Sequence, residues 1–321
     1  MKMKKVLALV LAAAAALSLA ACGGKGNTEN YPAKDLELVI PYKVGGTTDL
    51  AVRGVLDAIP SSVLDKNITV TNTVGGSGLI GTEEFLGHEA DGYTLGLLNC
   101  DLVLNYVSGA TDINPTERMI PLAAVEQDPY LLLGSKNASF STFAQFLEQA
   151  NANPDTLVVG VTGVGTVPNL LGAILLNAGV AVKVVPYDSA PDAIAAVLAN
   201  EADICISAMA PAIGQIDSGD LVPLAVTSAD RSQASPDVPT MAEVSDLFKD
   251  VNLLSWIMIA LPAGVDDSVV TYWKNALADA VASDTYAATR ESFYFEPITI
   301  TTDQLSDFVA EQSEYYKTLI A

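Results

Sequence analysis

From residue 36 onward, the sequence alternates short apolar runs of strand length with runs of about ten residues that have the pattern of helices. Alternation of this kind predicts βαβ units and parallel sheets, and therefore an α/β fold. It comes as two separate series, the first over residues 36–100 and the second over residues 157–227. Because about 300 residues exceed one domain of ordinary size, we predict two α/β lobes with a cleft between them.

The C-terminal part of the sequence decides how the chain is divided between these lobes. Two helices are predicted there, over Ser268–Ala282 and Thr302–Leu319, and they need a lobe on which to pack. We expect them on the first lobe, which makes that lobe discontinuous. Residues 35–127 plus 228–321 then form lobe 1, and residues 128–227 form lobe 2, so that the chain crosses between the lobes at least twice.

The first 22 residues have the pattern of a bacterial lipoprotein signal. Three lysines precede the apolar run Val6–Ala21, which is shorter than the roughly 20 residues that a membrane-spanning helix needs, and small residues lead into Cys22. We expect residues 1–21 to be removed as a signal peptide. Residues 22–34 then form the lipidated N-terminus and tether. This predicts an extracytoplasmic protein, anchored through Cys22 to the outer face of the cytoplasmic membrane or to a periplasm-facing membrane.

Charge and residue content exclude several classes of function. Without residues 1–21, 13 basic side chains stand against 38 acidic ones, a formal charge of −25, which is a poor surface for nucleic acid or anionic lipid. His88 is the only histidine, so a histidine metal cluster is excluded, and we expect it on the surface. Cys100 and Cys205 lie in apolar runs, which favours buried free thiols and gives no metal-type spacing. We therefore expect no metal.

One glycine motif suggests a cofactor. Gly76–Gly81 fits the dinucleotide pattern GxGxxG, follows a predicted strand, opens a helix, and precedes Asp101 by twenty residues. An exported chain has no pool of NAD available to it, however, and nothing else in the sequence resembles machinery for hydride transfer. We therefore interpret these glycines as allowing positive φ angles and close packing of helix on strand, and we expect no cofactor.

Two other glycine-rich turns are candidates for ligand contact, residues 41–49 (PYKVGGTTD) and residues 160–169 (GVTGVGTVPN). Each follows a predicted strand and leads into a helix, so free backbone N–H groups and the helix N-terminus create a site for an anion. The turns also carry four hydroxyl donors, Thr47, Thr48, Thr162 and Thr166. A carboxylate held in this way requires no lysine. The alternative interpretation is that both are tight turns with hydroxyl caps.

The order of these segments resembles the TctC/Bug family, the extracytoplasmic solute-binding receptors of tripartite tricarboxylate transporters. The most specific matching stretch is 219–239 (GDLVPLAVTSADRSQASPDVP), which continues into TMAE. The other matching segments are 41–49, 74–81 (VGGSGLIG), 90–95 (ADGYTL), 160–166, 185–190 (VPYDSA) and 199–203 (ANEAD). The resemblance implies a two-lobe, periplasmic-binding-protein-like (Venus flytrap) fold with a central cleft. It also implies a monomer that closes around a small carboxylate or amino-acid-like solute and delivers it to large and small integral-membrane subunits.

Carried onto this chain, the resemblance implies that turns from the two lobes face each other across the ligand. The expected contacts are Tyr42, Val44, Gly45, Gly46, Thr47, Thr48, Thr162, Gly163, Gly165, Thr166, Asn169, Tyr187, Ser189, Ala190 and Asp203. Asn169 departs from the family pattern because it stands where many relatives carry histidine. Asp188 and Ser189 stand where a Lys-Gly pair is common. If Asp188 faces the cleft, it disfavours a second carboxylate on the ligand and favours an amine or a neutral group; otherwise it is a solvated turn residue.

Catalytic motifs are missing from the sequence. We find no nucleophile elbow, no HExxH and no spacing that marks an acid/base pair, so we expect a receptor and not an enzyme. Two other functions remain open at this point. One is a sensor lobe that presents ligand to a membrane signalling partner, and the other is an extracytoplasmic hydrolase with an unrecognised carboxylate pair.

Overall fold

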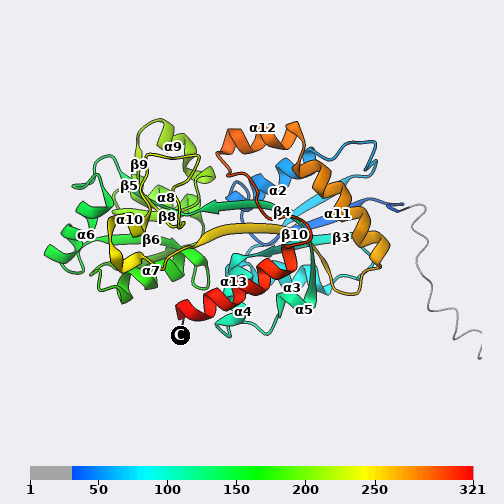
Figure 1. The fold of residues 1–321 in the computed structure, drawn as a ribbon, viewed down its shortest axis with the longest axis horizontal. Coiled ribbons are helices and arrows are strands. Elements are labelled where there is room, and N and C mark those ends of the chain that lie inside the picture. The colour runs from blue at the N-terminus through cyan, green and yellow to red at the C-terminus, as the bar shows by residue number, and fades with distance from the viewer. Residues whose placement is uncertain (1–30, 321) are drawn as a thin grey trace, which may run out of the picture.

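The computed structural model describes residues 31–320 (Figure 1). The predicted signal peptide, the predicted lipidation site Cys22 and most of the predicted tether lie outside the described residues. Within residues 31–320, none of the helices combines the length and the apolar character that a membrane span needs.

Each lobe of the described chain is built on a five-stranded sheet (Figure 1). The first sheet has the order β2-β1-β3-β10-β4 and the second the order β7-β6-β8-β5-β9. In both sheets three strands are parallel and the other two join antiparallel. The first sheet contains β1 (Leu36–Ile40), β2 (Ile68–Asn72), β3 (Thr94–Asn99), β4 (Met119–Pro129) and β10 (Leu254–Pro262). The second contains β5 (Leu131–Ser135), β6 (Val158–Thr162), β7 (Lys183–Tyr187), β8 (Ile204–Ser207) and β9 (Leu221–Val226). The α/β prediction is confirmed.

Helices cover both faces of the sheets. Those of the first lobe are α2 (Thr47–Asp57), η3 (Gly76–Gly78), α3 (Leu79–Gly87), α4 (Cys100–Val107), α5 (Pro115–Arg118), α11 (Asp267–Val281), α12 (Asp284–Phe293) and α13 (Leu305–Ile320). Those of the second are α6 (Phe143–Ala152), α7 (Val167–Asn177), α8 (Ala190–Leu198), η4 (Ala210–Ala212) and α9 (Ile213–Asp217). Both C-terminal helices, α11 and α13, contact β4 of the first sheet.

The alternation of side chains along β10 shows how the first sheet is buried. Trp256 and Met258 pack into one core with α4 and α13, while Ile257 and Ile259 pack into the opposite core with α2, α11 and α12. Successive side chains of a strand point to opposite faces, so a strand covered on both faces is apolar throughout. Figure 1 shows the two groups of helices on opposite sides of this sheet.

Two long strands connect the lobes. β4 and β10 pair antiparallel from Leu254↔Pro129 to Pro262↔Met119, and both extend toward the second sheet (Figure 1). Tyr130 follows β4 directly, and its backbone N–H donates to the Thr227 hydroxyl at 3.0 Å. The Thr227 backbone N–H donates in turn to the Tyr130 carbonyl, also at 3.0 Å. These bonds tie the end of β9 to the point where β4 enters the second lobe.

The chain does not return to the first sheet immediately after β9. Val226 forms a parallel bridge with Thr240, and α10 (Met241–Val244) contacts α6 of the second lobe. A short 3₁₀ turn, η5 (Asp246–Phe248), follows, and β10 then crosses back. The sequence places residue 228 onward in lobe 1, whereas residues 228–253 make these contacts with lobe 2.

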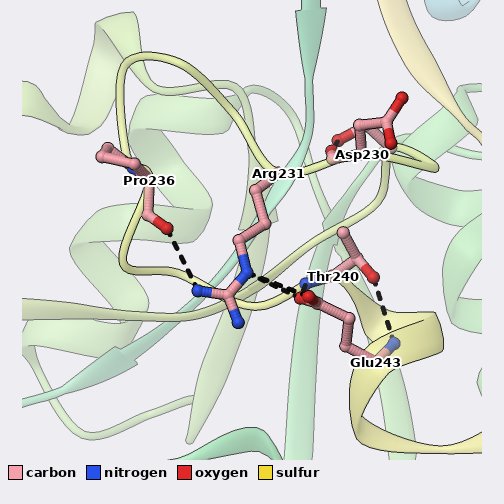
Figure 2. Close-up of polar contacts among 6 residues, drawn as sticks. Asp230, Arg231, Pro236, Thr240 and Glu243 are labelled. Atoms are coloured by element: carbon pink, nitrogen blue, oxygen red, sulfur yellow. Dashed lines mark hydrogen bonds and ion pairs between the residues drawn. The ribbon is translucent and has the colours of Figure 1, made fainter.

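Arg231 and Glu243 organise this connection (Figure 2). The Arg231 guanidinium donates to both carboxylate oxygens of Glu243, at 3.1 and 2.8 Å, and to the carbonyl of Pro236 at 3.1 Å. Glu243 also accepts from the Thr240 backbone N–H, and the Thr240 hydroxyl accepts from the Glu243 backbone N–H, which makes a capping box for α10. The stretch that most specifically resembles the family is therefore built to hold a loop and start a helix.

Candidate ligand-binding site

A cavity of about 530 Å³ lies between the lobes and is lined by residues of both. The first lobe contributes the turn after β1, the glycine turn at η3 and the start of α4. The second contributes the turns after β6 and β7 and the end of β8. Tyr130, Ser255 and Ile257, from the crossing between the lobes, also line it. A cavity of this size between two lobes suits a small molecule.

The N-termini of several helices converge on this cavity. The lining residues include the first residue or the N-cap of α2, α3, α4, α7 and α8. Each helix N-terminus carries partial positive charge and N–H groups without intrahelical partners. Side chains cap three of these helices: Asn99 for α4, Thr166 for α7 and Ser189 for α8. α2 has Gly46 as its N-cap and no side-chain cap.

Ten of the fifteen predicted contact residues line the cavity. They are Tyr42, Gly46, Thr47, Thr48, Thr162, Gly163, Thr166, Tyr187, Ser189 and Ala190. The two threonines after β6 have an additional local role. The Thr166 hydroxyl lies 2.7 Å from the Thr162 hydroxyl and donates to the Gly163 carbonyl at 2.8 Å. These bonds hold the shape of the turn after β6.

The other five predicted residues are not part of the cavity lining: Val44, Gly45, Gly165, Asn169 and Asp203. Val44 is 68% exposed. The backbone N–H of Gly45 donates to the buried Asp49 carboxylate at 3.0 Å, and this bond holds the turn before α2. The Asp203 carboxylate accepts from the backbone N–H of Val158 at 2.7 Å. Because Val158 begins β6 and the cavity lies at the other end of that strand, Asp203 supports the sheet away from the cavity.

The cavity includes residues that the sequence does not single out as ligand contacts. These are Gly75, Gly76, Ser77, Gly78, Asn99, Asp101, Tyr130, Ser207 and Ser255, among others. The GxGxxG pattern in the sequence marks the glycine turn, although it was not interpreted there as a ligand contact. At Gly81 the packing interpretation fits, because an added Cβ would lie 2.5 Å from the carbonyl oxygen of Thr73. Gly75, Gly76 and Gly78 have positive φ angles and face the cavity instead.

The two lobes touch each other around the cavity, in a closed arrangement. Lys43 of the first lobe lies 2.9 Å from the Asp192 carboxylate and 3.8 Å from that of Asp188, both in the second lobe. The Ser77 hydroxyl donates to the Val164 carbonyl at 2.5 Å. Deeper in the cleft, the Asn105 side-chain amide donates to the Gly165 carbonyl at 3.0 Å. These bonds join turns of opposite lobes.

Asp101 is the most buried charged residue of the cavity lining, at 8% exposed. One carboxylate oxygen accepts from the backbone N–H of Val167, across the cleft, at 2.8 Å. The other accepts from the Tyr42 hydroxyl at 3.1 Å, and that hydroxyl accepts from the Asn99 side-chain amide at 2.6 Å. Burial raises the pKa of Asp101 to about 6, although the hydrogen bonds from Val167 and Tyr42 act in the opposite direction.

Two further carboxyl groups are buried in β4, close to this side of the cavity. Glu126 accepts from the hydroxyl of Ser255, a cavity-lining residue, at 3.0 Å, and its other oxygen is buried without a hydrogen-bond partner. Asp128 accepts from the backbone N–H of Glu296 at 2.6 Å. Burial raises the pKa of Glu126 well above its usual range and that of Asp128 to about 7. We call Asp101, Glu126 and Asp128 the acidic cluster.

The cysteines and the histidine lie as predicted. Cys100 and Cys205 are free and buried, and burial raises the pKa of both thiols, so they stay neutral. His88 is exposed after α3. Among residues 31–320, no group of three or more His, Cys, Asp and Glu side chains is arranged to hold a metal ion.

Comparison with known proteins agrees with this architecture. Residues 52–321 match the family model described as "Tripartite tricarboxylate transporter family receptor". The chain is 26% identical to protein BugT of Bordetella pertussis over 316 residues, which cover 97% of this chain and 95% of BugT.

Two solved structures share the fold. MatC from Rhodopseudomonas palustris with bound malate has a TM-score of 0.81 at 20% identity, over 91% of this chain and 100% of that one. A second R. palustris protein, solved with adipate, has a TM-score of 0.80 at 23% identity, over 90% of this chain and 97% of that one. Because the family model spans most of the chain, the protein belongs to the TctC family and is a periplasmic-type solute-binding receptor, not an enzyme.

Proposed function

We propose that this receptor captures a small carboxylate in the cavity between its lobes and delivers it to the large and small membrane subunits of a tripartite tricarboxylate transporter. Its lipidated Cys22 keeps it at the membrane surface while it does so. The observation that carries the proposal is the convergence of helix N-termini on one cavity lined by both lobes. An anion placed there meets partial positive charge from several directions.

The N-terminus of α2 is the best anchor for the ligand carboxylate. Gly46, Thr47 and Thr48 line the cavity, and α2 begins without a side-chain cap. α7 is different, because the Asp101 carboxylate already accepts from its first N–H group, that of Val167. Thr162 and Gly163 lie on the opposite wall of the cavity. A carboxylate at α2 therefore contacts both lobes, and its binding favours the closed state.

The ligands of the two solved relatives support this chemical class. Malate and adipate are both small carboxylates, and each was found in a protein that shares this fold. The formal charge of the chain does not oppose such a ligand. Salt screens the negative charges spread over the surface. The backbone dipoles at the cavity are fixed and lie close to a bound anion, so they dominate the local field there.

Gly46→Asp tests the anchor directly. Gly46 has φ −78° and ψ 167°, an N-cap conformation that aspartate adopts well, and an added Cβ would meet only the Lys43 carbonyl, at 3.5 Å. The new carboxylate caps α2 and occupies the place proposed for the ligand. We expect the unliganded variant to be as stable as the wild type and to lose carboxylate binding by at least a hundredfold.

Calorimetric titration with a panel of mono-, di- and tricarboxylates provides the measurement. Gly214→Asp is the matched control, because nothing lies within 4 Å of its added Cβ and it does not line the cavity. Unchanged carboxylate binding by Gly46→Asp refutes the anchor at α2. Failure of every carboxylate to bind the wild type refutes the proposed function itself.

Delivery and anchoring need separate tests in cells. Deleting the receptor should abolish uptake of the carboxylate that it binds, and Gly46→Asp should fail to restore uptake where the wild type succeeds. Cys22→Ser should release the protein from the membrane fraction and remove labelling by a fatty-acid analogue. Uptake that persists without the receptor contradicts the delivery role.

A further inference from the structure

The cavity combines an anion site with a buried negative charge. Asp101 lines the cavity at the start of α4, and its two oxygens each accept one strong hydrogen bond, from Val167 and from Tyr42. Oδ1, which accepts from Val167, also accepts weakly from the Cys100 thiol at 3.8 Å, whereas Oδ2 accepts from Tyr42 alone. Because each carboxylate oxygen has about two acceptor positions, Oδ2 can accept a further hydrogen bond. A hydrogen-bond donor on a bound solute can therefore bond to the Asp101 carboxylate.

The charges around the cavity leave Asp101 without a cationic partner. Among the described residues that line the cavity, Lys43 is the only basic one, and Asp101 and Asp188 are the acidic ones. Lys43 lies at the rim and already pairs with Asp192 and Asp188. The Asp188 side chain is 89% exposed there, and solvent screens it. Lys43 therefore balances rim carboxylates, and Asp101 stays unbalanced deeper in the cavity.

Among the described residues, the titratable groups that act on Asp101 include no cation. Ser255 also lines the cavity and bonds to Glu126, and Asp128 lies two residues further along the same strand. Tyr42, Cys100 and Tyr130, which are also titratable and lie on this side, are neutral because burial raises the pKa of each. A second carboxylate of a ligand would meet like charge on this side of the cavity. A protonated amine would supply both the missing positive charge and N–H donors.

We propose that Asp101 is a specificity-determining residue that selects solutes carrying a protonated amine together with a carboxylate. The carboxylate of such a zwitterionic, amino-acid-like solute lies at the N-terminus of α2, and its ammonium group lies beside Asp101. This inference rests on the proposed function, because it takes the carboxylate anchor as given. It narrows the substrate class from carboxylates in general to amino acids and related amino carboxylates.

Matched pairs of probes that differ only in the amine provide the test. The pairs are succinate and aspartate, glutarate and glutamate, propionate and β-alanine, and butyrate and γ-aminobutyrate. Calorimetric titration of the wild-type protein at pH 7.5 should show at least tenfold tighter binding of the amine-bearing member in at least one pair. This comparison needs no variant, so it is independent of any effect of mutation on folding.

Asp101→Asn then assigns the preference to the residue. Asparagine keeps an oxygen to accept from Val167 and nearly the same shape, but removes the charge. We expect the preference for the amine-bearing probe to fall by at least tenfold, with binding of the amine-free partner unchanged or tighter. Glu83→Gln, an exposed charge removal on α3, is the control and should leave the preference unchanged.

The outcomes separate this inference from the proposed function. Equal binding of both members of every pair, or a preference that persists in Asp101→Asn, overturns the role of Asp101 while carboxylate binding stands. Tighter binding of dicarboxylates than of their amino counterparts overturns it as well. Absence of binding by every probe, with and without the amine, overturns both.

Discussion

The carboxylate of Asp101 accepts a hydrogen bond from the backbone N–H of Val167, 2.8 Å away across the cleft. Asp101 belongs to the first lobe, and Val167 is the first residue of α7 in the second. The chain thus places one of its own carboxylates at a helix N-terminus, where an external anion would otherwise bind. The contact exists only when the lobes are together, so it contributes to the closed state.

The acidic cluster should make the unliganded protein more stable at mildly acidic pH. The pKa of Asp101 is about 6 and that of Asp128 about 7 in the fold, both above the usual value of 3.8. The folded state then binds more protons than the unfolded state between about pH 4 and pH 7, so stability falls as pH rises through that window. We expect the free energy of unfolding, measured with urea, to be several kcal/mol lower at pH 7.5 than at pH 5.

Asp101→Asn serves as the comparison for this pH dependence. Tyr42, Cys100 and Tyr130 lie near Asp101, and the pKa of each is raised well above its usual range, so none of them titrates in this window. The pKa of Glu126 is also raised well above its usual range, so the fold keeps a proton that the unfolded chain loses, and Glu126 contributes to the pH dependence with the same sign. The variant should therefore lose the part of the difference between the two pH values that is due to Asp101 and keep the part due to Glu126 and Asp128. A wild type that gains stability from pH 5 to pH 7.5 contradicts the assignment.

Glu126→Gln should stabilise the protein at neutral pH. Glu126 is fully buried, one of its oxygens has no hydrogen-bond partner, and the charge of Asp128 lies close by. Glutamine keeps the shape and the bond with Ser255 while removing the cost of a buried carboxyl group beside another. We expect the free energy of unfolding at pH 7.5 to rise by about 1–3 kcal/mol. Destabilisation by this change would show that the carboxyl group has a partner essential to the fold.

Gly165→Ala should hinder closure. Gly165 has φ +90°, and an added Cβ would lie 2.4 Å from the side-chain oxygen of Asn105 in the opposite lobe. We expect ligand affinity to drop by at least tenfold, and small-angle scattering to show an expanded molecule at ligand concentrations that compact the wild type.

Gly179→Ala is a matched control for that change. It lies at the other end of α7 with φ +82°, and nothing lies within 4 Å of its added Cβ. Both variants bear the same cost of about 1 kcal/mol for a side chain in the left-handed region. Equal affinities for the two would mean that the contact with Asn105 has no part in closure.

Thr240→Ala should affect stability and leave binding unchanged. Thr240 is buried, caps α10 and bonds with Glu243, which Arg231 holds in turn (Figure 2). Loss of an N-cap hydroxyl lowers the free energy of unfolding by about 1 kcal/mol. Titration of the wild-type ligand provides the second readout. An altered affinity would indicate that the loop over residues 228–240 contributes to the ligand site.

The sequence predicts most of the framework because local patterns determine it. Strands such as β1 and β6 are short apolar runs that end in glycine turns, and α6 begins at a threonine cap, Thr142. β10 has no such pattern, because it is buried on both faces and is apolar at nearly every position, Ser255 being the exception. α4 follows β3 with no turn between them, so Cys100 at its start is also consistent with the end of a strand.

The cavity lining was predictable where a local turn pattern marks it. Thr47, Thr48 and Gly163 are recognisable from strand–glycine–helix order alone, and they line the cavity. Asp101 is different, because its role depends on Val167, 66 residues away in the other lobe. In the sequence it only completes the spacing of a dinucleotide motif. Pairing across a cleft leaves no local pattern from which to predict it.

β4 and β10 pair along nine positions and join the lobes beside the acidic cluster. When the lobes rotate about these paired strands, residues near the strands move little and residues far from them move more. We therefore expect Ser255 and Tyr130 to keep their neighbours when the lobes open, and Lys43 and Val164, which line the cavity from turns of opposite lobes, to move further apart. We expect an entering solute to meet this preformed inner wall first. We expect the turns at the rim to close over the solute afterwards and to control how long it stays.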